Sequence, residues 1–199
     1  LTWSDGGEFQ EEKYEALEST VKGVFLIHHL HKNAVPLEAV TLIVDTEAEQ
    51  VTRVLLTFGT ELSDKNVRPV ITFAHYGESK KILHGFTTDL CGWILDWKYT
   101  DDFIIRHSYI TPYSMTSPGE PSDDENDYLF RKTLPAQYVK IRENLCTVTF
   151  VEDGGSSVTL LIDMERLRDV GAFFGLGDDG QLWSFTIGAV AGKGTFGFT

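Results

Sequence analysis

The residues best suited to chemistry lie on a predicted strand over residues 145–152. Alternate side chains of a strand share one face, which here groups Cys146, Val148, Phe150 and Glu152. The three apolar neighbours would carry the Glu152 carboxyl into an apolar interior, where its charged form is disfavoured. A carboxyl in that setting holds a proton near neutral pH and serves as a general acid or base. The alternative is that Glu152 opens a turn and points to water.

Aromatic side chains occupy one face of each of two earlier predicted strands. The first face comprises Trp93, Leu95, Trp97 and Tyr99, and the second comprises Phe103, Ile105, His107 and Tyr109. Such faces form either a packed core or the lining of a pocket. If the two strands pair as a hairpin, His107 and Tyr109 face the same interior as Tyr99, whose hydroxyl needs a partner when buried.

These faces predict a division of roles. We assign Glu152 as the acid or base, with Tyr99 and His107 orienting or protonating a substrate. The predicted substrate contacts are Trp97, Tyr109, Phe150 and His28. His28 is included because it shares a strand face with Val24 and Leu26 and would point into a barrel.

The histidines of the segment 24–31 also invite a metal interpretation. His29 and His31 lie two residues apart on one strand face, a spacing that Zn²⁺ could use. A third ligand would have to come from His75, His84 or a carboxylate, and no further pattern supports one. We therefore predict neither a metal nor any other cofactor.

Composition narrows the class of protein. The chain has 199 residues, enough for one domain or two small joined ones. Its net charge of −13 argues against binding nucleic acid or a phospholipid surface. Two cysteines without metal spacing favour a reducing compartment, so we predict a cytoplasmic protein. No apolar run reaches the length of a transmembrane helix. The expected partner is a small molecule, with a homodimer as an option for the assembly.

The elements that must position these residues read as strands. Short runs with alternating or β-branched character recur along the chain and are separated by turn residues, which is typical of a sandwich or barrel. Helical patterns are weak and limited to 11–19 and one turn over 164–170. The acidic, Pro-rich segment 116–127 predicts either a solvated loop or a lid over a barrel mouth.

An internal repeat divides the chain into two similar halves. The first half runs from Tyr14 through 23–29 to Val-Thr-Leu-Ile-Val-Asp at 40–45. The second runs from Tyr138 through 144–150 to Val-Thr-Leu-Leu-Ile-Asp at 158–163. Duplication explains this match, as does chance likeness between two hairpins, and the first copy begins part-way through. We predict a partial barrel-like repeat over 1–85 that packs on a complete barrel over 86–199.

Four segments of the second half carry a family pattern: 87–99, 138–141, 158–175 and 185–189. On these segments the second half resembles the MoaF-like family of calycin, or lipocalin-like, barrels. It implies an antiparallel, all-β barrel. A fainter similarity to phenolic acid decarboxylases, also calycin barrels, rests on Trp97-Lys-Tyr99 and on Thr149-Phe-Val-Glu152. That family's Gly-Arg-Trp segment is absent here, which argues against a decarboxylase that binds a carboxylate through arginine.

The function expected from these observations is cofactor-free acid–base chemistry on a small aromatic or polyketide-like metabolite. Decarboxylation, cyclisation and isomerisation are the reactions considered, within secondary metabolism and in the lyase or isomerase classes. The alternative is a non-catalytic, lipocalin-like binding protein that uses the same barrel. A third option is an interaction protein whose barrel is fully packed. Ionisable side chains inside the barrel would favour the enzyme.

Overall fold

The computed structural model describes residues 2–3, 10–59, 67–78, 81–118, 131–152, 155–176 and 180–193. Every regular element in these ranges is a β-strand. The all-β prediction is therefore confirmed. Of the predicted loop over 116–127, residues 116–118 belong to a strand and the remainder lies outside the described residues.

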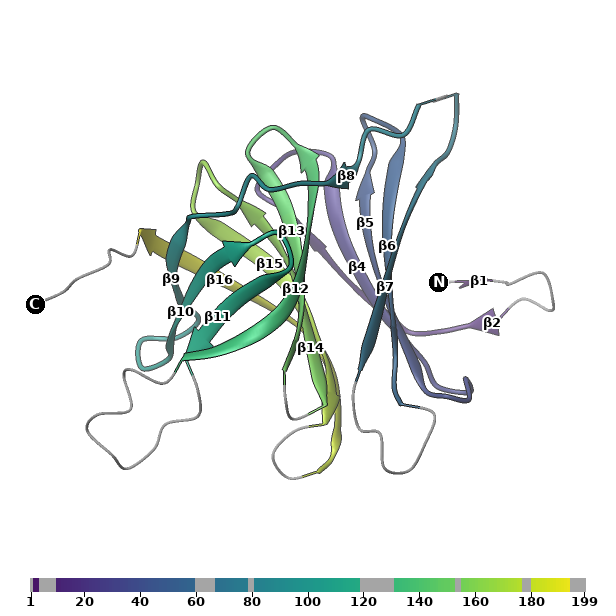
Figure 1. The fold of residues 1–199 in the computed structure, drawn as a ribbon. Coiled ribbons are helices and arrows are strands. Elements are labelled where there is room, and N and C mark those ends of the chain that lie inside the picture. Colours follow the sequence, from purple (N-terminus) through teal and green to yellow (C-terminus); the bar gives the residue numbers. More distant parts are fainter. Residues whose placement is uncertain are drawn as a thin grey trace, which may run out of the picture.

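Eight strands close into an antiparallel barrel (Figure 1). They are β9 (Ile94–Lys98), β10 (Ile104–Thr111), β11 (Ser114–Pro118), β12 (Arg131–Arg142), β13 (Leu145–Glu152), β14 (Ser156–Asp163), β15 (Arg168–Leu176) and β16 (Leu182–Lys193). Each strand pairs with the next along the chain, and β16 returns to β9 with Val190 opposite Lys98. Closure leaves no unpaired sheet edge around the ring. The two-residue strand β8 (Gly85–Phe86) adds to β12 beside β11.

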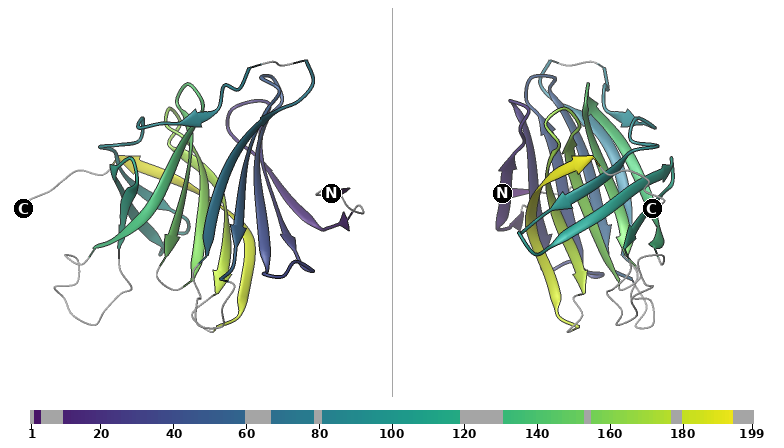
Figure 2. Two further views of the ribbon diagram at one scale, coloured as in Figure 1. Left: turned by 45° about the vertical axis from the view of Figure 1, so that its right-hand side comes forward. Right: turned by 90° about the vertical axis from the view of Figure 1, so that its left-hand side faces the viewer.

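A second, open sheet precedes the barrel in the chain. Its strands are β3 (Tyr14–Glu18), β4 (Val24–His31), β5 (Glu38–Asp45), β6 (Gln50–Thr57) and β7 (Arg68–His75), paired in sequence order. A short hairpin of β1 (Thr2–Trp3) and β2 (Gln10–Glu11) stands before it. The views of Figure 2 place this sheet against one side of the barrel.

Two predicted helical segments are strands or turns instead. The segment 11–19 contains β3, whose backbone pairs with β4 from Tyr14 to Glu18. The segment 164–170 contains a four-residue turn, after which β15 begins at Arg168. Both segments are too short to form a stable helix alone, so pairing with a neighbouring strand decides their conformation.

The contact between sheet and barrel is an apolar layer. One cluster joins the sheet to the outer face of the barrel: Val24, Leu26, Ile43, Val139, Ile141, Leu145, Leu161 and Ala172. A second cluster places Phe174 of β15 against Val54 and Leu56 of β6. Burying these side chains holds the two parts together because apolar surface leaves water.

The predicted repeat is matched by a repeated backbone device. Oδ1 of Asp45 accepts the backbone N–H groups of the second and third residues after it, at 3.1 and 2.8 Å. Oδ1 of Asp163 does the same at 2.9 and 2.8 Å. Each Asp ends a strand and organises the following turn. This explains why Val-Thr-Leu-aliphatic-aliphatic-Asp appears twice.

Positive backbone angles mark the same positions in the two halves. Glu49 (φ 56°) and Leu167 (φ 53°) each lie four residues after the Asp of their turn. Gly23 (φ 77°) and Asn144 (φ 57°) each lie directly before the strand that precedes the Asp-ending strand, which is β4 in the open sheet and β13 in the barrel. The pairing registers agree with this correspondence, except that Ala16 rather than Tyr14 is equivalent to Tyr138. The open sheet β3–β7 is thus an incomplete counterpart of β12–β16.

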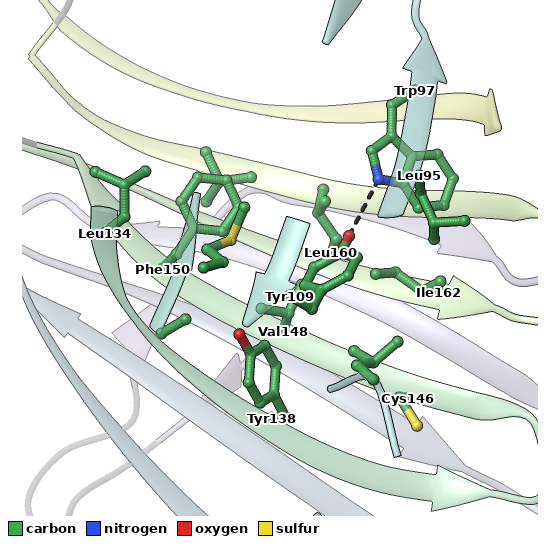
Figure 3. Packing of buried hydrophobic residues seen from close by; sticks show 14 of the residues in the cluster. Leu95, Trp97, Tyr109, Leu134, Tyr138, Cys146, Val148, Phe150, Leu160 and Ile162 are labelled. Carbon is green, nitrogen blue, oxygen red and sulfur yellow. Dashed lines mark hydrogen bonds between the residues drawn. The ribbon is translucent and has the colours of Figure 1, made fainter. Parts of the chain in front are cut away.

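The barrel interior is filled by large side chains from all around the ring (Figure 3). Trp97, Tyr109 and Tyr138 are essentially fully buried. Nε1 of Trp97 donates a hydrogen bond to the hydroxyl of Tyr109 at 3.1 Å. The indole N–H therefore has a partner in an otherwise apolar core, as a buried polar atom requires.

Candidate acid–base site in the barrel interior

The barrel interior contains a carboxyl that sequence analysis missed. Asp169 lies at the start of β15, on the strand face of Gly171 and Phe173 that turns inward, and its side chain is buried. Its Oδ1 accepts the backbone N–H of Ala189 on β16 at 2.6 Å. Its Oδ2 is buried and makes no hydrogen bond of ordinary geometry among the described residues, although the Tyr99 hydroxyl interacts with the carboxyl. Burial raises the pKa of Asp169 to about 7, against a smaller opposing effect of its hydrogen bonds.

Tyr99 interacts with this carboxyl. It follows the end of β9, packs on the interior cluster and stacks at a tilt on Phe103 with ring centroids 5.8 Å apart. Burial raises the pKa of Tyr99 well above its ordinary value, and the nearby Asp169 adds to the rise. The phenol therefore stays protonated and remains a hydrogen-bond donor at neutral pH.

His107 lies deep in the same interior. Its ring packs edge-on against Phe150 at 5.4 Å and against Tyr109 at 6.1 Å between centroids. Its Nδ1 is buried without a partner among the described residues. Burial lowers the pKa of His107 to about 3, so the imidazole is neutral at pH 7. A neutral imidazole can accept one proton or hydrogen bond and donate another.

Glu152 stands at the end of β13, where the strand leaves the interior. Its side chain is half-buried, and its Oε2 accepts a hydrogen bond from Oγ of Ser156 across the hairpin at 2.6 Å. Its charge contributes to the raised pKa of Tyr99, so the two groups lie within electrostatic reach. Glu152 therefore lies between the two predicted alternatives, since at the rim of the barrel its side chain is neither fully buried nor fully in water.

The predicted substrate contacts Trp97, Tyr109 and Phe150 all belong to the packed interior. Around the end of the barrel where β15 meets β16, further aromatic rings gather that were not predicted. Phe173 stacks on Phe185 at 5.2 Å, and Trp183 lies 5.9 Å from Phe185. These rings are half-buried or exposed, so they form the more open part of the aromatic lining.

His28 is placed elsewhere. Its Nδ1 pairs with Oγ1 of Thr41 within the open sheet, and its Nε2 pairs with Oγ of Ser184 on β16, both at 2.9 Å. The side chain therefore bridges the sheet to the outside of the barrel and does not enter the interior. Alternation correctly grouped it with Val24 and Leu26, but that face packs on the barrel instead of lining it.

The other histidines of β4 do not form a metal centre in this structure. The rings of His29 and His31 lie 4.7 Å apart. Burial, together with the neighbouring His31 and His28, lowers the pKa of His29 to about 4. Within the described parts of the chain, no group of three or more His, Cys, Asp or Glu side chains is arranged to hold a metal ion.

Comparison with known families identifies the part of the chain that contains this site. The profile described as the MoaF C-terminal domain matches residues 84–194, more than half of the sequence. The chain belongs to the MoaF C-terminal domain family. Comparison with curated proteins finds no match. Among the described residues, no helix is long and apolar enough to cross a membrane.

The MoaF C-terminal domain match runs from just before β8 to the end of β16 and therefore spans the whole barrel. Asp169, Tyr99, His107 and Glu152 all lie inside it, whereas His28 and the open sheet lie outside. The predicted family and the barrel typical of calycins are confirmed. Asp169 was missed because residues 164–170 were read as a helical turn, which hid the alternation that begins at Arg168.

Proposed function

We propose that the barrel of this MoaF-family chain takes up a small aromatic metabolite and moves protons on it without a cofactor, as in an isomerisation or cyclisation. The observation that carries the proposal is the Asp169 carboxyl, buried inside the barrel with a pKa of about 7. A group with that pKa is close to the ideal for general acid–base catalysis at neutral pH. Its Oδ2 makes no hydrogen bond of ordinary geometry, so a substrate atom can compete with the Tyr99 hydroxyl for it.

In the proposed step, a β,γ-unsaturated ketone is isomerised through its dienolate. The Asp169 carboxylate accepts the proton on the α-carbon, and the hydroxyl of Tyr99 donates a hydrogen bond to the carbonyl oxygen, where negative charge develops. Asp169 then returns the proton at the γ-carbon, so both residues regain their starting states. Glu152 lies opposite Ser156, towards the other end of the strands from Asp169, and would contact the distal part of the substrate. Tyr99 and the neutral His107 would orient the carbonyl group.

The aromatic rings of β15 and β16 also favour an aromatic substrate. Phe173, Phe185 and Trp183 line the more open end of the interior and offer flat apolar faces. Asp169 and His107 are closed in by packed side chains, so uptake requires these rings to move aside.

The two unpaired thiols, Cys91 and Cys146, support the cytoplasmic location that we propose for the protein.

Proton exchange on a bound ketone tests the proposal. We expect the protein to accelerate the exchange of the α-protons of 2-tetralone with D₂O, measured by loss of their NMR signals. Asp169→Asn should reduce the acceleration at least tenfold, because it removes the proton-transfer group. The control is Asp96→Asn, which changes a carboxyl paired with Arg106 on the outer face of the barrel.

The same experiment separates the proposal from its alternative. A lipocalin-like binding protein would bind 2-tetralone, seen as quenching of tryptophan fluorescence, without accelerating exchange. Exchange that is equally fast in the wild type and in Asp169→Asn would contradict the assignment of Asp169.

A further inference from the structure

A pocket separate from the acid–base site opens on the surface beside the barrel. Its volume is about 540 Å³, within the range of small-molecule sites. It lies between the β10–β11 turn, the segment after β8 and the middle of β12. Its lining residues are Phe86, Thr87, Thr88, Pro112, Tyr113, Gln137 and Tyr138.

The pocket exists because β12 changes partner along its length. β12 pairs with β11 as far as Pro135 and with β8 from Val139 onward. Backbone hydrogen bonds fix both rims: the N–H of Ala136 donates to the carbonyl of Tyr113 at 2.9 Å, and the N–H of Thr87 donates to the carbonyl of Tyr138 at 3.1 Å. The hollow between the rims is therefore part of the sheet geometry.

The lining combines exposed rings with neutral polar groups. Tyr113 is 79% exposed and Phe86 is 62% exposed, far more than folding requires of aromatic residues. No charged side chain is among the described lining residues. A charged ligand would therefore find no ionic partner in the wall of a protein that is strongly acidic overall.

Part of the polar lining of the pocket has unused hydrogen-bonding capacity. Thr87 is already engaged, because its Oγ1 accepts the backbone N–H of Asp89 at 3.1 Å and its hydroxyl bonds the Asp89 side chain. Oε1 of Gln137 is buried without a hydrogen-bond partner among the described residues. Such an amide gains by turning towards a ligand hydroxyl. The hydroxyl of Tyr138 is already used, since it donates to the carbonyl of Ser114 at 2.7 Å.

We infer that this pocket binds a neutral sugar ring. A pyranose presents an apolar C–H face, which packs on aromatic rings such as those of Tyr113 and Phe86. It also presents hydroxyls that both donate and accept hydrogen bonds, matching the Thr88 hydroxyl and the Gln137 amide. A purely aromatic ligand would leave these polar groups unpaired, and a charged ligand would lack a counter-charge. The site does not depend on the acid–base function of the interior.

Titration with simple glycosides tests the inference. The probes are the methyl glycosides of glucose, galactose, mannose and N-acetylglucosamine, followed by saturation-transfer NMR and by shifts of protein amide signals. We expect saturable binding of at least one glycoside at millimolar concentration, with the amides of residues 86–88 and 113 shifting. Tyr113→Ala and Phe86→Ala should each weaken it at least tenfold.

The controls keep the test independent of folding. Ile110→Ala removes an exposed apolar side chain of β10 that lies outside the pocket lining, and it should leave glycoside binding unchanged. Circular dichroism and melting temperature check that each variant folds. The inference is overturned if none of the glycosides binds, if the pocket variants bind as well as the wild type, or if benzoate or naphthalene binds there more tightly than every glycoside.

Discussion

At the scale of single residues, burial sets the protonation of the barrel interior. It raises the pKa of Asp169 to about 7 and lowers the pKa of His107 to about 3, so at pH 7 the imidazole is neutral and the carboxyl is divided between its two forms. Desolvation explains both directions because it penalises whichever form carries charge. Asp169 can therefore both accept and donate a proton near neutral pH.

The raised pKa of Asp169 predicts a pH-dependent stability. The folded-state pKa is about 7 and the ordinary value is 3.8, so the carboxyl's contribution is fully present below about pH 3.8 and is lost as the pH rises through about 7. Asparagine stays neutral and does not undergo this loss. We expect the free energy of unfolding of Asp169→Asn, relative to wild type, to rise by roughly 2 to 3 kcal/mol between pH 5 and pH 8.

Urea unfolding at both pH values measures this difference. Asp96→Asn again serves as the control, because its carboxyl is partly exposed and paired with Arg106. A gap between Asp169→Asn and wild type that stays constant from pH 5 to pH 8 would refute the raised pKa.

At the scale of elements, both Asp turns also connect the two parts of the molecule, since Oδ2 of Asp163 accepts a hydrogen bond from Thr20, which precedes β4. Both organise a turn, but only Asp45 also receives a bidentate pair of hydrogen bonds from Arg142 at the end of β12. Burial alone would raise the pKa of Asp45, but Arg142 and the backbone N–H of Ala48 outweigh it and hold the pKa below its ordinary value. The same residue thus shapes a turn and ties the open sheet to the barrel.

A double-mutant cycle tests this connection. Asp45 is fully buried and Arg142 is mostly buried, so removing one partner leaves the other charge or its polar neighbours unsatisfied. We expect Asp45→Asn and Arg142→Met each to lower the free energy of unfolding by about 3 kcal/mol. The double variant should lose clearly less than the sum. Strict additivity in urea unfolding would show that the pair is not coupled.

At the scale of the whole molecule, neutral histidine holds part of the junction between sheet and barrel. His28 makes its two hydrogen bonds across this junction, and burial lowers its pKa to about 4, partly offset by Glu15. The unfolded chain binds a proton at this side chain near pH 6.5, whereas the folded chain resists it. The stability that depends on neutral His28 is therefore lost as the pH falls from about 6.5 to about 4.

Acid unfolding of His28→Gln tests this role. The amide of glutamine can still bond Thr41 or Ser184 but does not titrate. Between pH 7 and pH 5 the variant should lose roughly 1 to 2 kcal/mol less stability than wild type. His75→Gln, an exposed position on β7, should follow the wild-type curve. If His28→Gln instead loses as much stability as wild type on acidification, His28 is not a source of acid sensitivity.

Strand alternation made much of this architecture predictable. The strand 145–152 appears with the predicted bounds, and the grouped faces of β9, β10 and β13 do point into one interior. The Asp that ends both repeated segments also has a local cause, because each Asp organises the turn that directly follows it in the chain. Asp169 was not predictable in the same way, because a turn followed by a strand resembles a short helix until the pairing of β15 with β14 is known.

What the sequence by itself determined is which side chains share a face, since that follows from the two-residue period of a strand. What only the tertiary structure decided is which face becomes an interior. His28 and Phe150 both lie on apolar strands, yet His28 meets the outside of the barrel and Phe150 its core. The closure of β16 onto β9 and the packing of the open sheet make that choice. They depend on contacts between residues far apart in the chain, which no local pattern records.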